Sequence, residues 1–368
     1  MLLFCFSIVF VGSPIARALA HRFGIIDRPA PGTPKTHRNP TAYLGGVFVF
    51  IALLAGFLLV SQDKHQIEEF VKGGRSGFFE DVNIPLVFIA LSFIFFVGLI
   101  DDILGTRPKK SGLHPWLKMG LLSVGGTILF IAGIKVSFMP SDILNYPLTI
   151  FWILGITNAA NVIDNMNGQS MGSGFVVAFF YFIIGSKNGD PLTIGLSLAL
   201  MGTTLGFLPY NFPKASLFLG DSGSMTLGFY IAMLGMLAGR PSVIEGHLLT
   251  GTLAPIFVLM FFVFDTWFVA ISRGKRKINF WWGGLDHTAH RLNNLGYSKP
   301  FSIIIIWILN VIFGLVALVI YHTAPWFAVP FMFVAFFIAL RFWGWLNSIP
   351  IEEVDISLSG GPTKKSII

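Results

Sequence analysis

The chain alternates between long apolar runs and short polar segments. About eleven runs of roughly 17 to 22 residues consist mostly of hydrophobic side chains, and each can cross a hydrocarbon layer about 30 Å thick as one helix. The approximate spans are 1–20, 43–61, 83–100, 113–133, 146–160, 170–186, 190–208, 220–239, 248–271, 300–321 and 324–346. Because the fifth run is short and the seventh and eighth are rich in glycine, the pattern predicts an all-α polytopic membrane protein with ten or eleven transmembrane helices.

Composition excludes a soluble protein. The chain is 54% hydrophobic and only 12% charged, with a mean hydropathy of +0.75. It shows neither a long polar stretch nor a repeat of fixed period, so we expect one polytopic membrane domain, 1–346, and a cytoplasmic tail, 347–368. The first run has no small-residue cleavage site and is interpreted as a retained helix. A single cysteine, Cys5, excludes an internal disulfide framework.

Positive charge is distributed unequally between alternate loops. One set of loops holds 19 of the 25 Lys and Arg residues, and by the positive-inside rule that set is cytoplasmic. With eleven helices the N-terminus then lies outside and the C-terminus inside. The net charge of +7 is interpreted as a topology signal and an attraction to headgroups and phosphates, not as nucleic-acid binding.

One polar stretch, Asn158 to Gly168, separates two apolar runs near the middle of the chain. Its carboxylate and carboxamides need partners, because an unpaired polar group in hydrocarbon costs several kcal/mol. Asn158, Asn161 and Asp164 recur every three residues, which places three oxygen-bearing side chains along one edge of a helix or of a turn that extends it. Such oxygens suit Mg²⁺ or hydrogen bonds to a sugar or base. The alternative is a polar turn between two helices.

Two adjacent acids, Asp101 and Asp102, end the third apolar run. Paired carboxylates at a membrane boundary either bind a cation or repel each other, and acids at a helix C-terminus oppose the helix dipole. Lys118 lies one turn inside the fourth run and is suited to pairing with an acid or a phosphate. The alternative is an exposed helix end that happens to carry two acids.

A further acid, Asp221, follows the segment between the seventh and eighth runs. It would lie near a helix N-terminus among small residues, where backbone amides can approach an anion. The alternative is an aspartate that only caps the helix.

The last large loop, 273–299, is basic and contains His287 and His290. Three residues apart, the two imidazoles share one face of a helical turn, with Arg291 beside them. Zinc is disfavoured because neither a cysteine nor a third histidine accompanies them. Contact with a phosphate or diphosphate fits better.

All four polar clusters fall on the predicted cytoplasmic side. A transporter more naturally places ionisable residues near the membrane midplane, at broken helices. The pattern therefore favours an enzyme that acts at the interface on a water-soluble anion and a lipid. A cation-coupled transporter is kept as the alternative from another class.

These clusters, in this order, resemble the polyprenyl-phosphate N-acetylhexosamine-1-phosphate transferases, glycosyltransferase family 4. The similarity spans residues 27–296, and four segments carry it: Asp101-Asp102, Asn158 to Gly168, Phe218 to Ser224, and Asp286 to Leu292. The separated histidines, with Lys35, His37 and Arg38 in the first basic loop, look most like undecaprenyl-phosphate GlcNAc-1-phosphate transferases. Phospho-MurNAc-pentapeptide translocases usually carry adjacent histidines instead.

The resemblance implies transfer of a sugar-1-phosphate, expected to be GlcNAc-1-phosphate, from a UDP-sugar to undecaprenyl or another polyprenyl phosphate. UMP would be released, and the lipid-pyrophosphate-linked sugar would begin cell-envelope glycan synthesis at the membrane. Mg²⁺ would be required, with Mn²⁺ as a substitute, because phosphoryl transfer needs charge neutralisation and alignment. A phospho-MurNAc-pentapeptide translocase of peptidoglycan synthesis is the alternative within the family.

Residue roles follow from the matching motif positions. By this similarity Asp221 is the chief Mg²⁺ ligand, with Asn161 beside it. Asp101 and Asp102 would position or deprotonate the lipid phosphate, with Lys118 nearby.

The donor substrate would meet the other two clusters. The resemblance implies that His287, His290 and Arg291 hold the diphosphate, while Asp164 and Asn167 contact the uridine or the sugar. At Asn167 the chain departs from bacterial relatives, which commonly have Asp.

The expected location is the bacterial cytoplasmic membrane, with a multi-pass chain whose active site faces the cytoplasm. The expected partners are a UDP-sugar and a polyprenyl phosphate lipid, with no nucleic acid. The sequence leaves a homodimer open.

Overall fold

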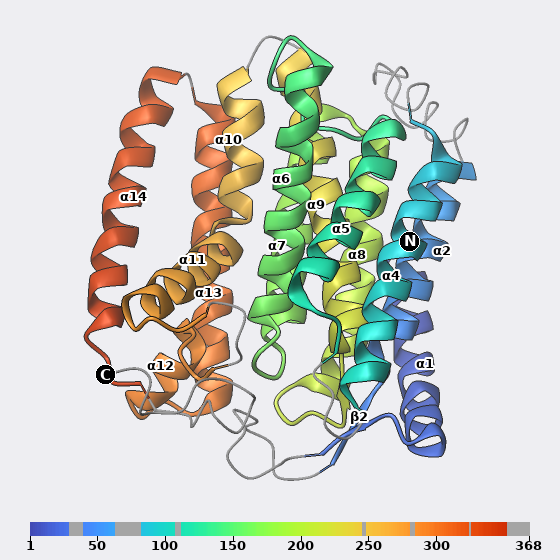
Figure 1. Ribbon diagram of the computed structural model, residues 1–368. Coiled ribbons are helices and arrows are strands. Elements are labelled where there is room, and N and C mark those ends of the chain that lie inside the picture. The colour runs from blue at the N-terminus through green and yellow to red at the C-terminus, as the bar shows by residue number, and fades with distance from the viewer. Residues whose placement is uncertain are drawn as a thin grey trace.

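The computed structural model describes residues 1–28, 40–62, 82–106, 112–244, 248–279, 284–323 and 325–351, and within them the chain forms a bundle of long helices (Figure 1). The first basic loop with Lys35, His37 and Arg38, and most of the predicted tail, lie outside these ranges. The elements in chain order are α1 Leu2–Phe23, β1 Ile26–Asp27, β2 Thr41–Tyr43, α2 Gly45–Gln62, α4 Ile84–Gly105, α5 Pro115–Ile131, α6 Asp142–Ile163, α7 Gln169–Asn188, α8 Pro191–Asn211, β3 Leu217–Phe218, α9 Gly220–Ile244, α10 Leu248–Val258, α11 Met260–Lys275, α12 Thr288–Asn294, α13 Lys299–His322 and α14 Pro325–Asn347.

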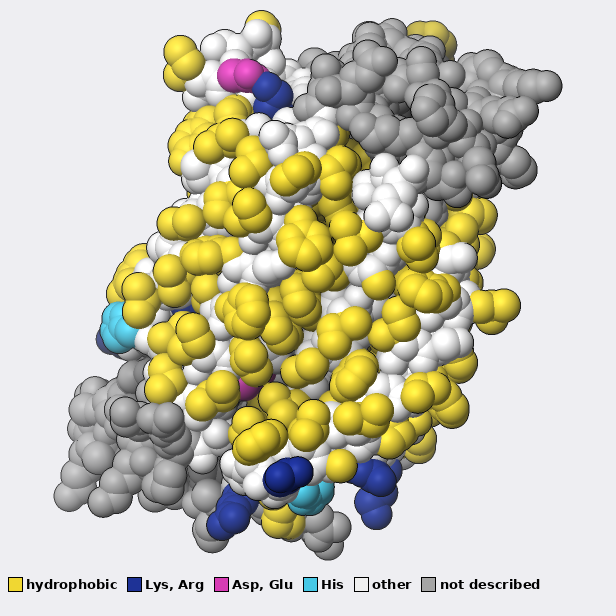
Figure 2. Space-filling view, turned by 90° about the vertical axis from the view of Figure 1, so that its right-hand side faces the viewer, with side chains coloured by type: hydrophobic (Ala, Val, Ile, Leu, Met, Phe, Trp, Pro, Cys, Tyr) yellow, Lys and Arg dark blue, Asp and Glu magenta, His cyan; other side chains and the backbone are white. Residues whose placement is uncertain are grey.

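The helices confirm the predicted all-α polytopic membrane class. Among the described residues, nine helices are long and apolar enough to cross a membrane, and the bent pair α10–α11 makes a tenth if it counts as one span. The predicted fourth run is the apolar helix α5, which at 17 residues is shorter than these. On the face shown in Figure 2, hydrophobic side chains form a broad belt, and Lys and Arg gather at the lower end. The chain is an integral membrane protein.

Two predicted boundaries change. The run 248–271 is not one helix, because α10 and α11 meet at a 66° bend. Pro255 lies inside α10 and cannot donate a backbone hydrogen bond there, which weakens the helix just before the bend. The short run 146–160 is part of α6, a full-length helix of 22 residues that includes Asn158 and Asn161.

Several helices begin with an acceptor side chain followed by proline. Asn83 accepts a hydrogen bond from the backbone N–H of Leu86 at 3.1 Å, and Asp190 accepts one from Leu192 at 3.1 Å. In both helices proline occupies the first turn, where its missing N–H costs nothing. These local signals fix where α4 and α8 begin.

Helix α9 lies at the centre of the bundle, packed against α4 and α6 and wholly buried over its 18-residue apolar window. Two glycines, Gly98 on α4 and Gly228 on α9 itself, allow this close packing. A Cβ on Gly98 would lie 2.6 Å from the carbonyl oxygen of Asp221, and one on Gly228 would lie 2.6 Å from the Cβ of Ala160. The start of α9 is therefore held against the ends of two other helices.

A small three-stranded sheet closes one end of the bundle, at the bottom of Figure 1. Strand β1 pairs antiparallel with β2, and β2 pairs parallel with β3, with Tyr43 beside Phe218. The sheet joins the end of α1 to the segment that enters α9. It thus orders the loops around the cavity described next.

Candidate active site

A cavity of about 640 Å³ opens at the end of the bundle that carries the sheet. Its lining comes from segments far apart in the chain, including the ends of α4, α6 and α11, the start of α9 and the loop before α12. Eight of the ten predicted site residues line it: Asp101, Lys118, Asn161, Asp164, Asn167, Asp221, His287 and His290. Asp102 and Arg291 are absent from the lining.

Lys118 joins two carboxylates from different helices. Its Nζ lies 3.0 Å from Oδ2 of Asp101 and forms an ion pair with Asp221. The Asn161 amide donates to Oδ1 of Asp221 at 3.0 Å and to Oγ of Ser224 at 2.9 Å. Two acids thus converge on one cation, which offsets their mutual repulsion.

Asp101 also fixes the loop that precedes α5. The backbone N–H of Leu113 donates to its Oδ1 at 2.5 Å. The loop approaches closely because Gly112 adopts φ 77°, and a Cβ there would lie 2.7 Å from the same oxygen. One carboxylate oxygen therefore orients the loop and the other faces Lys118.

Asp102 has a different position from its neighbour. Its carboxylate accepts hydrogen bonds from the backbone N–H of Asp221 at 2.6 Å and of Ser222 at 2.9 Å. Gly220, with φ 73°, makes this close approach of the Asp102 carboxylate possible, because a Cβ there would lie 2.6 Å from Oδ2. Asp102 is 4% exposed and caps the start of α9. This position does not fit the predicted contact with a lipid phosphate.

Asp164 follows the last turn of α6 and faces the cavity beside the acid–lysine cluster. Removal of water from its carboxylate raises its pKa to about 8, and the negative charges of Asp221 and Asp102 add to the shift. A carboxyl group in this state can donate a hydrogen bond near neutral pH.

The turn after α6 is held by two residues that the sequence analysis missed. Asn211 accepts a hydrogen bond from the backbone N–H of Gly168 at 2.6 Å and donates to the carbonyl of Leu217 at 3.1 Å. The indole N–H of Trp307 donates to the carbonyl of Gly168 at 3.3 Å. Asn211 was visible in the sequence as a polar residue at the end of an apolar run, whereas nothing marked Trp307.

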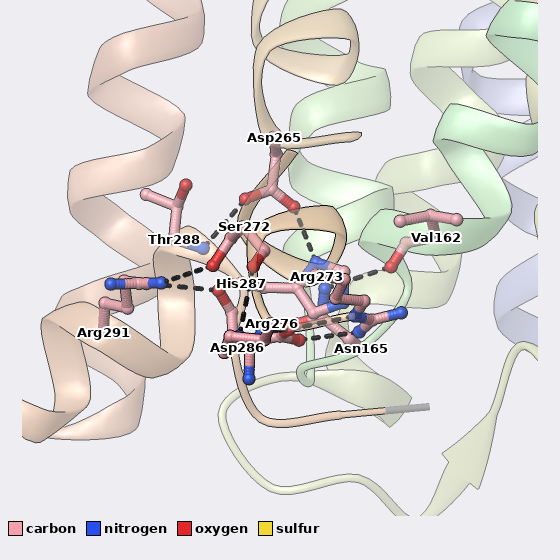
Figure 3. Close-up of polar contacts among 10 residues, drawn as sticks. All are labelled: Val162, Asn165, Asp265, Ser272, Arg273, Arg276, Asp286, His287, Thr288 and Arg291. Carbon is pink, nitrogen blue, oxygen red and sulfur yellow. Dashed lines mark hydrogen bonds and ion pairs between the residues drawn. The ribbon is translucent and has the colours of Figure 1, made fainter. Parts of the chain in front are cut away.

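Two carboxylates, those of Asp265 and Asp286, hold the loop that carries His287 and His290 (Figure 3). Asp265 accepts from the backbone N–H of Thr288 at 2.8 Å, and its other oxygen lies 2.8 Å from Nδ1 of His287. A carboxylate on one ring nitrogen fixes the orientation of the imidazole and leaves the other nitrogen for the cavity. Asp265 was also missed, although a lone acid in an apolar run is a functional signal.

Asp286 pairs with Arg273, near the end of α11, and with Arg276, which directly follows that helix. Its oxygens lie 2.9 Å from Nε and 2.6 Å from Nη2 of Arg273, and 2.5 Å from Nη2 of Arg276. Burial alone would raise the pKa of Asp286, but the hydrogen bonds and charge of Arg273, with His287 and Arg276, hold it well below its usual range. Arg273 also lines the cavity and so brings a guanidinium to it.

His290 is a buried imidazole on the cavity wall. Burial, followed by the charge of nearby His287, lowers its pKa to about 3, so it is neutral at pH 7. Neither ring nitrogen has a hydrogen-bond partner among the described residues. A neutral imidazole with free hydrogen-bonding capacity can contact a ligand that enters the cavity.

Arg291 points away from the cavity. It is 1% exposed, and its guanidinium donates to the carbonyls of Leu346 at 2.8 Å and Ile349 at 3.0 Å and to Oγ of Ser272 at 3.0 Å. This placement does not fit the predicted contact between Arg291 and a diphosphate. The helical turn that places the two histidines together turns the next residue toward α14.

Comparison with other proteins decides the family. Residues 84–239 match glycosyl transferase family 4. A probable undecaprenyl-phosphate N-acetylglucosaminyl 1-phosphate transferase of Bacillus subtilis is 30% identical over 336 residues, which cover 89% of this chain and 86% of the relative. The chain belongs to glycosyl transferase family 4. The resemblance inferred from the four polar clusters is therefore confirmed.

Two further relatives differ in the reaction their names describe. A decaprenyl-phosphate N-acetylglucosaminephosphotransferase of Mycolicibacterium smegmatis is 27% identical over 326 residues, 81% of this chain and 76% of the relative. A phospho-N-acetylmuramoyl-pentapeptide-transferase of Clostridium botulinum is 28% identical over 252 residues, 65% of this chain and 72% of the relative. Relatives named for each of the two transferase reactions that the sequence analysis kept open are thus similar to this chain.

Proposed function

We propose that this protein transfers GlcNAc-1-phosphate from UDP-GlcNAc to undecaprenyl or another polyprenyl phosphate and releases UMP. The observation that carries the proposal is the pairing of Lys118 with Asp101 and Asp221 inside a cavity that His287 and His290 also line. The reaction joins two phosphate-bearing substrates, so it needs a cation and acids at one wall and neutral or positive donors at the other. The names of the relatives that cover most of the chain support the same acceptor lipid and the same transferred group.

In the proposed reaction, an oxygen of the lipid phosphate attacks the phosphorus that bears the sugar. The bond from that phosphorus to the bridging oxygen breaks, and the electron pair leaves with UMP. Asp101, oriented by the Leu113 N–H and by Lys118, would receive the remaining acidic proton of the lipid phosphate. Lys118 would exchange one of its carboxylate partners for the incoming phosphate, because the phosphate also carries negative charge.

Mg²⁺ fits the chemistry of this donor set. Among the described residues no three His, Cys, Asp or Glu side chains gather as a preformed metal site. Mg²⁺ commonly binds through one or two carboxylates plus substrate phosphates, so a site completed by the substrate is the expected arrangement. Asp221 would hold the ion with the amide oxygen of Asn161 beside it. When bound, the ion neutralises charge on the diphosphate and aligns it.

The opposite wall would bind the donor. His287, oriented by Asp265, and neutral His290 would donate hydrogen bonds to the diphosphate, with Arg273 adding positive charge. Asp164 and Asn167 would contact the uridine or the sugar from the turn after α6. Asp102, outside the lining, would instead position Asp221.

We also propose that the cavity faces the cytoplasm of a bacterial cell, with the N-terminus outside and the C-terminus inside. Exposed Arg17 and Arg22 lie at the cavity end of α1, whereas exposed Lys187 lies at the far end of α7. A single cysteine at position 22 should react with a membrane-impermeant maleimide only in opened cells. Reaction from outside intact cells at position 22 but not at position 187 would reverse the orientation.

The decisive experiment is the formation of UMP by purified protein supplied with UDP-GlcNAc, undecaprenyl phosphate and Mg²⁺, with Asp221→Asn as the inactive control. UMP formed only from UDP-MurNAc-pentapeptide would favour the translocase that the Clostridium relative's name describes. Ion flux in vesicles without UMP release would favour a transporter. The mass of the detergent-solubilised protein would show whether it is a homodimer.

A further inference from the structure

Arg291 carries a charge into the protein interior, where it meets neutral acceptors. Besides the carbonyls of Leu346 and Ile349 and the hydroxyl of Ser272, its Nε donates to the carbonyl of Asp286 at 3.3 Å. Its guanidinium also stacks on the ring of Phe268, 4.8 Å from the centroid. One side chain therefore contacts α11, the histidine loop and the end of α14.

The acceptors on α14 are backbone carbonyls at its C-terminal end. Leu346 lies in the last turn of α14, where its carbonyl also accepts from the backbone N–H of Ile349 at 3.1 Å, and Ile349 lies just beyond the helix. A cation at a helix C-terminus also interacts favourably with the helix dipole. Around this contact Leu346 and Ile349 pack on Phe264 and Phe268 of α11, and Asn294 donates to the carbonyl of Pro350 at 3.0 Å.

The same short helix presents the histidines. Within α12 the backbone N–H of Arg291 donates to the carbonyl of His287 at 3.0 Å, and His290 is its immediate neighbour. Within the described part of the chain, no residue of α14 lines the cavity. Any influence of α14 on the cavity must pass through contacts such as this one.

We propose that Arg291 is a positioning residue, through which the end of the C-terminal helix α14 fixes the loop that presents His287 and His290 to the donor substrate. The guanidinium suits this role, because several N–H groups in one plane can serve acceptors from different elements at once. A lysine would keep the charge but could not bridge the same set. The effect on the donor rests on the proposed function, whereas the effect on the loop does not.

The test uses a thiol probe in the loop. The native Cys5 is buried, so the chain offers a low-background protein for labelling. Leu285→Cys places a thiol on the cavity wall between the arginine-bound Asp286 and Gly284. Its labelling rate by a maleimide is measured in full-length protein, in Arg291→Lys, in a chain ending at Trp345, which lacks both carbonyl acceptors, and in the two changes combined. A chain ending at Ile351 keeps both acceptors and is the matched control.

We expect Arg291→Lys and the chain ending at Trp345 each to label about tenfold faster. This corresponds to a loss of roughly 1.4 kcal/mol in the free energy that holds the loop closed. The combination should label no faster than the chain ending at Trp345 alone, because that chain already lacks the carbonyls that Arg291 contacts on α14. The chain ending at Ile351 should match the full-length protein. Unchanged labelling in folded Arg291→Lys would overturn the proposal, even if the shorter chain failed to fold. Multiplied effects in the combination would also overturn it.

Substrate kinetics separate positioning from general destabilisation. Arg291→Lys should raise the KM for UDP-GlcNAc and leave the KM for the lipid unchanged, whereas lower stability alone would reduce the amount of active enzyme without changing either KM. If full-length protein makes no UMP, the proposed function fails, and the labelling experiment still tests the contact.

Discussion

The backbone N–H of Asp221 donates a 2.6 Å hydrogen bond to the carboxylate of Asp102, which precedes it by 119 residues. Through this bond the end of α4 holds the start of α9, and Asp221 is thereby placed beside Lys118 and Asn161. The adjacent acids Asp101 and Asp102 thus have separate positions: Asp101 faces the cavity, and Asp102 supports the helix that carries the proposed metal ligand.

Asp102→Ala should reduce both stability and turnover. It leaves two N–H groups at the start of α9 without an acceptor, and for a buried group such a loss costs about 1–3 kcal/mol. We expect a lower thermal midpoint and a kcat reduced at least ~100-fold, because Asp221 loses its position. Thermal unfolding and steady-state kinetics check both. A variant with a native midpoint and a raised KM for the lipid alone would show instead that Asp102 binds the lipid phosphate.

Removal of divalent metal should abolish turnover. We expect EDTA to stop UMP formation and Mg²⁺ or Mn²⁺ to restore it, with Asp221→Ala reduced at least ~100-fold, the scale for loss of one electrostatic stabiliser. Asp142→Ala is the control, because that acid forms an exposed ion pair with Lys135 and such pairs contribute little. Turnover at the full rate in EDTA would refute the assignment of Asp221.

The acid and histidine clusters should act on different substrates. Asp101→Asn should depress kcat far more than donor affinity, because proton transfer belongs to the transition state. His290→Ala should mainly raise the KM for UDP-GlcNAc, because it removes a contact to the bound donor. Kinetics with each substrate varied in turn decide this. The division fails if His290→Ala leaves the donor KM unchanged while Asp101→Asn raises it.

His290 should make the protein less stable in mild acid. Its folded pKa of about 3 lies below the usual value of 6.5, so between these values the unfolded chain binds a proton that the folded chain does not. Stability should therefore fall as pH drops below about 6.5, by up to about 1.4 kcal/mol per pH unit for this one group. Thermal midpoints from pH 7 to pH 4 should fall less steeply in His290→Gln. Parallel curves for the two proteins would contradict the expectation.

The sequence predicted much of this arrangement. Apolar run lengths located the helices, and the positive-inside rule with helix ends on one side predicted that Asp101, Asp164, Asp221 and His287 would meet. These predictions rest on local pattern and on topology, which sequence order largely determines.

The remainder depended on side-chain direction and tertiary contact. Asp101 and Asp102 are adjacent, as are His290 and Arg291, and one step around a helix turns a side chain from the cavity to the protein interior. Apart from Thr266, Asp265 is surrounded in sequence by apolar residues, and its contact with His287 is visible only in the folded chain. No sequence pattern distinguishes such neighbours without the packed structure.

The full enclosure of α9 bears on how the chain enters the membrane. A span surrounded by other helices has no lipid-facing side, so it can contain Asp221, serines and glycines, and its hydropathy of 1.3 is well below the 3.1 of α13. Insertion from the translocon depends on the hydrophobicity of the segment itself, which makes α9 a poor independent inserter. Its residence in the bilayer then depends on α4 and α6, which are synthesised first and form its walls. The enclosure of α9 therefore ties the insertion of Asp221 to the order in which the helices are synthesised.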